Sequence, residues 1–381
     1  MLLIKNAKIK PMVGCDIENG YIHVGFDGKI LAVGEGVADI AAETVIDAGG
    51  RLVTPGLVEG HCHLGYDGGA GSGFNETTDP ITPHLRAIDA LEPRDKEIAS
   101  ARESGITTIC TGPGSTNIIG GTFAAIKTCG KRIDDMIVKY PLAMKCAFGE
   151  NPANCFGNEK GRAPRTRMMI AAMLRELFFK TRIYLEAKEC GKNPTFDMKL
   201  EAMIPVLKGE LPLKCHVHTA TDIFTLIRIA NEFGFKFTID HCTDGSLIAE
   251  ELAELGLDAL VGPSFGAKTK REVENRCFDT LGVLHKAGVR VSVITDAPVT
   301  QIRYLSMFAG FAVAAGLPYD EGWRAITINP AVTVGISDRV GSLEVGKDGD
   351  AVIWDGDPLK EIGATTAYMT VINGKVVFQK N

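Results

Sequence analysis

The chain has 381 residues, of which 45% are hydrophobic and 23% charged, and its net charge of −6 argues against a nucleic-acid or anionic-membrane partner. Its ten cysteines include no Cys-x-x-Cys pair, which favours free thiols in a reducing compartment over a disulfide framework or a cysteine zinc site. The opening MLLIKNAKIK lacks the order of a signal peptide, and no apolar run of about 18 residues predicts a membrane span. We therefore expect a cytoplasmic globular protein.

Both ends of the chain are rich in short strand patterns. Residues 1–53 contain GYIHVGFDGKILAVG, in which Asp-Gly separates two alternating runs as in a hairpin. Residues 339–381 repeat this character in DAVIWDGDP and AYMTVINGKVVFQKN. We predict that the two ends pair into one small β-sandwich domain.

Between them, residues 54–338 alternate strand-like and helical stretches. The predicted strands are GLVEGHCH, TTICTG, VKYPLAMKCA, LKCHVH, FTIDHC, ALVGPS and RVSVITD, with GTFAAIK as an eighth. The predicted helices cover residues 95–104, 167–190, 222–233, 246–255, 271–287 and 302–315. This α/β pattern predicts a parallel, TIM-type (β/α)8 barrel. The basic stretch KTKREVENR (268–276) is expected to form a solvated helix face.

Histidines follow the first barrel strand, in TPGLVEGHCHLGYDGG. Residues two apart on a strand share a face, so His61 and His63 point the same way and Cys62 points the other way. At the carboxyl end of a barrel strand, that face borders the place where such barrels hold their active sites.

The same arrangement recurs at later strand ends. His216 and His218 end LKCHVH, His241 ends FTIDHC and Asp296 ends VSVITD. Imidazole and carboxylate groups are the ligands of catalytic zinc sites, although iron, manganese and cobalt accept them as well. These six residues predict a divalent-metal site, and the other three histidines are expected to be structural.

Lys145 ends another strand, within YPLAMKCAFGENP. A lone buried lysine is costly, so its side chain either reaches solvent, pairs with Glu150 or loses its charge. A neutral amine that has reacted with carbon dioxide becomes a carbamate, an oxygen ligand able to bridge two cations.

This arrangement resembles the metal-dependent amidohydrolase superfamily, and within it the imidazolonepropionase and prolidase-like (Xaa-Pro dipeptidase-like) members. The segments VIDAGGRLVTPGLVEGHCHLG and AITINPAVTVGISDRVGSLEVGKDGDAVIWDGDP resemble the joints between barrel and sandwich in that superfamily. The resemblance covers essentially the whole chain.

The resemblance implies a ligand set. His61, His63 and Asp296 would hold a first metal, and carbamylated Lys145 would bridge it to a second metal on His216 and His241. His218 would then either support a metal ligand from behind or face the substrate as a catalytic group. If Lys145 is unmodified, one metal is expected instead, with His61, His63, His216 and Asp296 as its ligands.

The implied activity is hydrolysis of an amide C–N bond by metal-bound hydroxide, in a dipeptide, an N-acyl amino acid or a cyclic amide. Asp296 would accept the proton of the water and pass it to the leaving nitrogen. The alternatives are a single-metal deaminase or cyclic amidine/imidazolone hydrolase, and a non-catalytic assembly protein of the same fold. Homo-oligomers are common among such proteins.

Substrate contacts are predicted in three loops. Asn117 lies in the glycine-rich TGPGSTNIIGG, and Glu150 and Asn151 follow Lys145. Arg303 and Tyr304 follow Asp296, and an arginine there could bind a substrate carboxylate through two hydrogen bonds.

Overall fold

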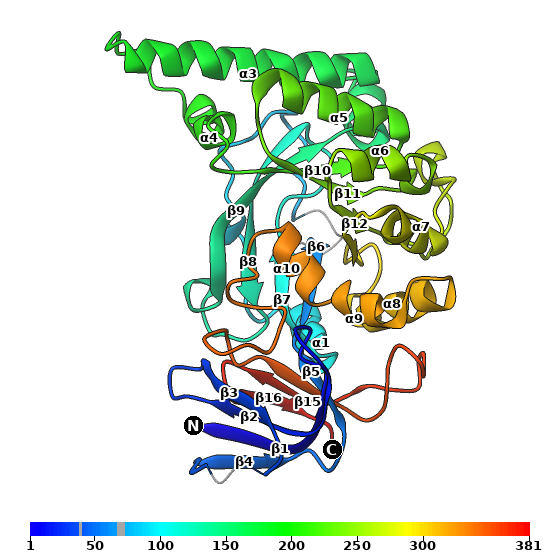
Figure 1. Cartoon of the computed structure of the whole chain (residues 1–381). Coiled ribbons are helices and arrows are strands. Elements are labelled where there is room, and N and C mark those ends of the chain that lie inside the picture. The colour runs from blue at the N-terminus through cyan, green and yellow to red at the C-terminus, as the bar shows by residue number, and fades with distance from the viewer. Residues whose placement is uncertain (38–39, 67–72) are drawn as a thin grey trace.

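The computed structural model describes residues 1–37, 40–66 and 73–381, which form two eight-stranded sheets with helices around one of them (Figure 1). The larger part is a nearly closed barrel. Its strands run in the order β13-β12-β11-β10-β9-β8-β7-β6. They are β6 (Leu57–Cys62), β7 (Ile106–Thr111), β8 (Ile119–Lys127), β9 (Ile137–Ala147), β10 (Leu213–Val217), β11 (Phe237–His241), β12 (Ala259–Val261) and β13 (Val291–Val293).

The barrel is closed between β6 and β13 by the chain that follows α9. Val58 of β6 donates a backbone hydrogen bond to Ile326, and Val293 of β13 donates one to Ala325. His63 and Ala297 join the two carboxyl ends directly, with 2.6 Å between N and O. This last bond brings the end of the first barrel strand next to Asp296.

All eight predicted barrel strands are present, but the expectation of a wholly parallel barrel is wrong for β8. This strand is antiparallel to both β7 and β9. Residues 112–118 connect β7 to β8, and this connection is too short for the crossover that parallel neighbours require. The chain therefore turns back as a hairpin.

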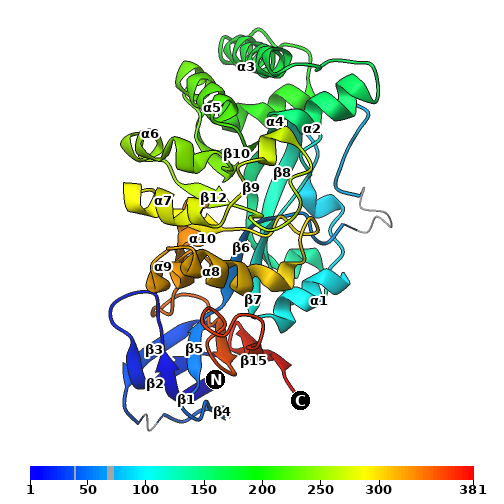
Figure 2. The same cartoon turned by 90° about the vertical axis from the view of Figure 1, so that its right-hand side faces the viewer.

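Helices cover the outside of the barrel, and Figure 2 shows α5, α6 and α7 stacked along one side. The six predicted helical regions coincide wholly or in part with α1 (Lys96–Glu103), α3 (Arg167–Glu189), α5 (Ala220–Phe233), α6 (Ala249–Glu254), α7 (Asp279–Ala287) and α8 (Leu305–Ala314). Side chains cap several of them; for example, Asp95 accepts from the Glu97 N–H at the start of α1.

Within the described residues, four further α-helices were not predicted. They are α2 (Glu150–Pro152), α4 (Met198–Leu207), α9 (Tyr319–Arg324) and α10 (Ile328–Thr333). Three are very short, and Pro205 lies inside α4, where proline normally argues against a helix. Among the described residues, no helix is long and apolar enough to cross a membrane.

The two chain ends form the second sheet, as Figure 1 shows below the barrel. Its strands are β1 (Leu2–Ile9), β2 (Ile17–Val24), β3 (Ile30–Glu35), β4 (Thr44–Asp47), β5 (Leu52–Pro55), β14 (Ala351–Trp354), β15 (Ala367–Ile372) and β16 (Lys375–Gln379). Strand β5 pairs with β1 on one side and β14 on the other, which confirms that the ends share a sheet. The hydrogen bonds join all eight strands in one sheet, so a two-layered sandwich with limits at residues 53 and 339 stays a prediction.

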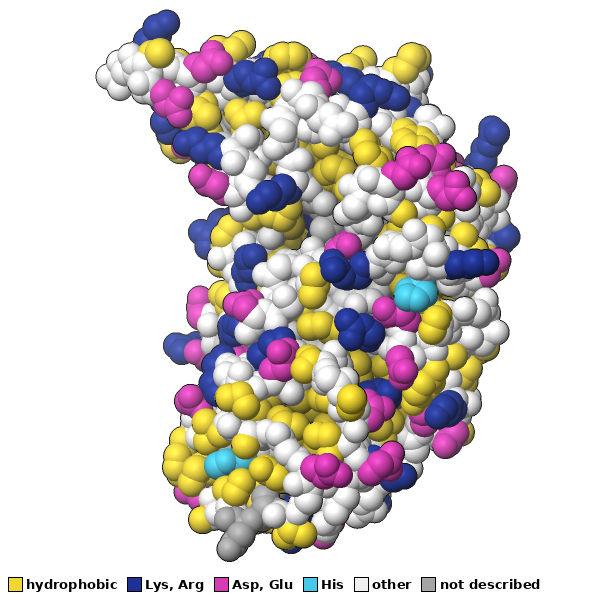
Figure 3. All heavy atoms as spheres, viewed as in Figure 1, with side chains coloured by type: hydrophobic (Ala, Val, Ile, Leu, Met, Phe, Trp, Pro, Cys, Tyr) yellow, Lys and Arg dark blue, Asp and Glu magenta, His cyan; other side chains and the backbone are white. Residues whose placement is uncertain are grey.

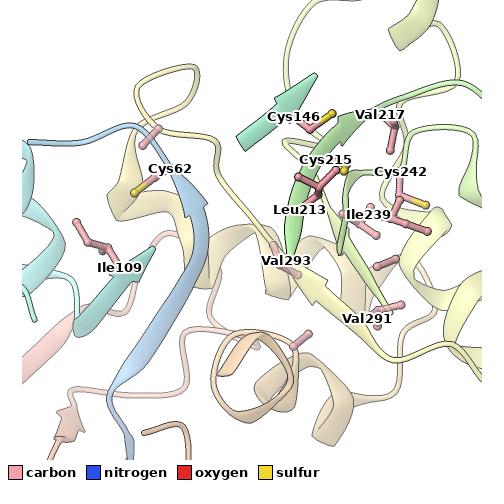
Figure 4. Packing of buried hydrophobic residues seen from close by; sticks show 14 of the residues in the cluster. Cys62, Ile109, Cys146, Leu213, Cys215, Val217, Ile239, Cys242, Val291 and Val293 are labelled. Carbon is pink, nitrogen blue, oxygen red and sulfur yellow. The ribbon is translucent and has the colours of Figure 1, made fainter. Parts of the chain in front are cut away.

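Strand alternation divides the barrel residues between two environments. Cys62, Leu213, Cys215 and Val217 belong to the hydrophobic cluster between the strands and the helices, part of which is drawn in Figure 4. The residues that alternate with them along the strands point to the opposite face, and these include His61, Lys214 and His216. On the outer surface, acidic and basic side chains are interspersed over the face drawn in Figure 3.

Candidate metal centre and active site

Two groups of buried side chains lie at the carboxyl ends of the barrel strands. In the first group, Asp296 Oδ1 lies 3.5 Å from His61 Nε2 and 3.3 Å from His63 Nε2. The second group consists of His216, His218 and His241. Within each group, one potential ligand atom from each residue lies within 4.8 Å of the others. We call them the first and the second cluster.

Lys145 joins the first cluster from strand β9. Its side chain is completely buried, and its Nζ lies 3.3 Å from His61 Nε2. Burial lowers the pKa of Lys145 to about 8, although the charges of Asp240 and Asp296 act in the opposite direction. The ring centroids of His61 and His241 are 5.1 Å apart, so the two clusters adjoin.

The imidazole rings are held by their outer nitrogens. His61 Nδ1 donates to Asp240 Oδ2 at 2.7 Å, His63 Nδ1 donates to Gly112 O at 2.8 Å and His241 Nδ1 donates to Gly262 O at 2.7 Å. His218 Nδ1 lies 2.7 Å from Thr243 Oγ1. Metal-binding histidines usually have a partner of this kind on the nitrogen that does not bind the metal.

The side-chain atoms of the clusters that have no hydrogen-bond partner suit the coordination of a metal ion. Among the described residues, His216 Nδ1, His241 Nε2 and Asp296 Oδ1 are buried polar atoms without a hydrogen-bond partner. Burial lowers the pKa of His63 to about 4 and that of His241 to about 3, so both rings are neutral and able to coordinate. Burial would raise the pKa of Asp296, but the neighbouring histidines hold it well below its usual range.

Two site residues have an unusual backbone. His241 has φ of 76° and Asp296 has φ of 53°, both in the left-handed region that non-glycine residues seldom adopt. Such conformations persist where the surrounding structure fixes them, and they are frequent at functional sites.

Sequence reasoning missed the buried charges beneath the clusters. Glu59 accepts hydrogen bonds from His61 N at 3.0 Å, Thr295 N at 2.9 Å and Thr295 Oγ1 at 2.6 Å, and so joins β6 to the segment that carries Asp296. Lys214 Nζ lies 3.2 Å from Asp240. Their signal was visible as single charges inside apolar strand runs, in GLVEGHC, LKCHV and FTIDH.

A cavity of about 500 Å³ opens above the clusters. His63, His216, His218 and Asp296 line it, which places three histidines and the carboxylate within reach of a ligand. Of the predicted substrate contacts, Asn151 lines the cavity, with its Nδ2 3.3 Å from His216 Nε2.

The structure places the other predicted substrate contacts elsewhere. Asn117 Nδ2 donates to the carbonyls of Glu76 and Asp79, each at 2.7 Å, and so fixes a loop. Glu150 Oε1 accepts from the backbone of Glu272 at 3.1 Å.

Arg303 and Tyr304 are also outside the described lining of the cavity. Arg303 is exposed and donates to Tyr304 Oη at 3.2 Å. The predicted carboxylate-binding role of Arg303 is therefore not supported.

Comparisons with known proteins agree with this geometry. The sequence model of the protein family described as "Amidohydrolase family" matches residues 205–377. The structure of an amidohydrolase from Thermotoga maritima superposes with a TM-score of 0.95 at 36% identity, with both chains covered in full. These matches, together with a barrel whose strand ends carry potential metal ligands, define a hydrolase that acts on C–N bonds. The chain belongs to the amidohydrolase family.

Curated relatives are more distant. Amidohydrolase tasK of Hapsidospora irregularis is 28% identical over 94% of this chain, but the match spans only 41% of tasK. Imidazolonepropionase of Bacillus velezensis is 24% identical over 93% of this chain and 88% of its own length.

Proposed function

We propose that this enzyme is a two-metal amidohydrolase that cleaves an amide C–N bond of a small molecule, with carbamylated Lys145 between the metals. The observation that carries the proposal is the place of Lys145, whose Nζ is 3.3 Å from His61 Nε2 where the two clusters adjoin. A structural lysine would be expected to reach solvent or a carboxylate. Lys145 instead ends among potential metal ligands.

The environment of Lys145 supports its modification. With a pKa of about 8, a sizeable fraction of the amine is uncharged near neutral pH. The uncharged nitrogen forms a bond to the carbon of carbon dioxide and releases one proton, which gives an anionic carbamate. The new negative charge would then be held among the metal ions.

The residues present suit zinc. His61, His63 and Asp296 would hold one ion, and His216 and His241 would hold the other, with the carbamate of Lys145 shared. A bound divalent cation supplies water with a pKa lowered to about 7 and polarises a carbonyl group.

Asp296 and His218 would act on the substrate itself. Asp296 lines the cavity and keeps its carboxylate ionised, so it can accept a proton and transfer it to the leaving nitrogen. His218 also lines the cavity, and its hydrogen bond with Thr243 fixes the ring. We assign to it the orientation of the substrate carbonyl, although its place in the second cluster also suits a metal ligand.

Metal content and intact mass test the proposal together. Protein produced with zinc and bicarbonate should contain about two zinc ions per chain and, in native mass spectrometry, the added mass of one carbon dioxide on Lys145. One metal and an unmodified Lys145 would contradict it.

The second candidate is the single-metal hydrolysis of an imidazolone-like cyclic amide. It is favoured by the relative named imidazolonepropionase, which matches 93% of this chain. In that case His61, His63, His216 and Asp296 would hold one ion, and Lys145 would stay an amine. Cyclic amides and ring amidines would then be screened first, for hydrolysis and for deamination.

A further inference from the structure

One wall of the cavity is built by the segment that follows β12. It contributes apolar groups, Phe265 and Val273, and two cations, Lys270 and Arg276. These cations belong to the stretch KTKREVENR, which was expected to be a solvated helix face. That expectation holds for Lys268, Arg271 and Glu274, which are exposed. It does not hold for Lys270 and Arg276, which line the cavity, or for Glu272, which is buried.

The positive charge of Lys270 already has protein partners. Its Nζ donates to Asn151 Oδ1 and lies 3.3 Å from Glu272 Oε1. Asn151 in turn lies against His216. Lys270 therefore connects this wall to the second cluster through Asn151. Because its charge is already paired with Glu272, it is a poor candidate for binding an anionic ligand.

Arg276 is different. Its guanidinium is half-buried, and no carboxylate of the described residues lies within 4.0 Å of it. Burial lowers the pKa of Arg276 from its usual value, and the charge of Asp296, which also lines the cavity, acts against this. A guanidinium has five N–H donors and binds a carboxylate through two parallel hydrogen bonds.

We propose that Arg276 binds a carboxylate of the substrate, so that the enzyme acts on N-acyl amino acids or dipeptides with a free carboxylate rather than on neutral cyclic amides. The proposal rests on the proposed cleavage of an amide at the metal clusters. Phe265, Val273 and Val299 give the cavity apolar surface for the side chain of such a substrate. A volume of about 500 Å³ is in the usual range for small-molecule sites.

The test compares acids with their neutral counterparts. A panel of N-acetyl amino acids (Gly, Leu, Phe, Glu) and the matching N-acetyl amino-acid amides is given to the zinc-loaded full chain. Calorimetry measures binding, and acetate release measures kcat/KM. The wild type should prefer acids. Arg276→Met should lower kcat/KM or affinity for the acids about 10- to 100-fold and leave the amides within about twofold.

Two further variants make the result specific. Arg271→Met removes an exposed arginine of the same segment and should behave like the wild type. Arg276→Lys keeps the charge without the two-pronged geometry and should recover part of the loss. Unchanged thermal unfolding of Arg276→Met shows that the fold is retained.

The outcomes separate the two proposals. Equal use of acids and amides, or a loss in Arg276→Met that is the same for both, overturns the role of Arg276 while amide cleavage stands. Binding of acids that depends on Arg276, without turnover of any compound, supports Arg276 and contradicts the proposed function. Absence of both binding and turnover overturns both.

Discussion

The carboxylate of Asp240 lies 2.7 Å from His61 Nδ1 and 3.2 Å from Lys214 Nζ, so one buried anion supports the ring of a potential metal ligand and neutralises a buried cation. Burial would raise the pKa of Asp240, but Lys214 and His61 hold it below its usual range. Ring orientation and charge balance are therefore coupled in one residue, and the two effects can be separated by mutation.

Asp240→Asn should weaken zinc binding about 10- to 100-fold, because the partner that orients His61 is weakened. It should also lower the free energy of unfolding by about 3–5 kcal/mol, because Lys214 is left buried and unpaired. Lys214→Met combined with Asp240→Asn should regain stability but not zinc affinity. Chelator competition and chemical denaturation measure the two quantities, and joint recovery of both would contradict this division.

Asp296→Asn should abolish turnover while much of the metal stays bound, since four histidine ligands and Lys145 remain. Metal analysis of the purified variant beside an activity assay checks this. Complete loss of metal with a misfolded protein would contradict the assignment of Asp296 as the base.

Lys145→Met should reduce the zinc content from about two ions to one and remove the carbon dioxide mass. The matched control is Lys139→Met, on the exposed part of the same strand, which should keep both. An added mass that persists in Lys145→Met would place the modification on another residue.

His218→Asn should keep two metals and lose activity if His218 faces the substrate carbonyl. Its Nδ1 contact with Thr243 leaves the other nitrogen directed to the cavity or to the second cluster. Loss of one metal in this variant would instead make His218 a ligand.

Stability at low pH should depend on Asp348, far from the metal clusters. Burial would raise the pKa of Asp348, but Lys127, Lys29 and Arg339 lower it below the usual 3.8. The unfolded chain therefore binds the proton more readily, and this contribution to stability is complete above pH 3.8 and is lost as the pH falls through the lower folded-state pKa.

Asp348→Asn should thus lower the free energy of unfolding near neutral pH by about 1–3 kcal/mol. In the variant, this free energy should also fall less steeply at acidic pH, the acid limb of its pH dependence. Denaturation at several pH values in the presence of a chelator measures this without contributions from metal binding. An acid limb as steep as that of the wild type would show that other carboxylates control it.

The parts that sequence predicted well depend on short-range geometry. His61 and His63, or His216 and His218, share a face because strand side chains alternate, and a barrel brings the carboxyl ends of its strands together. The clusters follow from these two facts. The antiparallel β8 could have been suspected from its short connection to β7.

Sequence says least where a loop decides the direction of a side chain. Arg303 and Arg276 are both arginines in polar segments after barrel strands, and nothing in the local pattern separates them. Only the folded path shows that Arg276 lines the cavity while Arg303 is exposed. The hydrogen bonds of Asn117 to Glu76 and Asp79 were equally hidden, since these partners are distant in sequence.

The pairing of β5 with β14 bears on how this protein is made. Strand β5 ends at Pro55 and its partner begins at Ala351, so all the barrel strands are synthesised between them. Throughout synthesis one edge of β5 stays without that partner, and such edges invite association with other chains. The barrel residues lie between the two strands and can fold first as they emerge. This sheet is thus completed only after the barrel residues have been synthesised, which makes nascent chains that stop before Ala351 the species most dependent on chaperones.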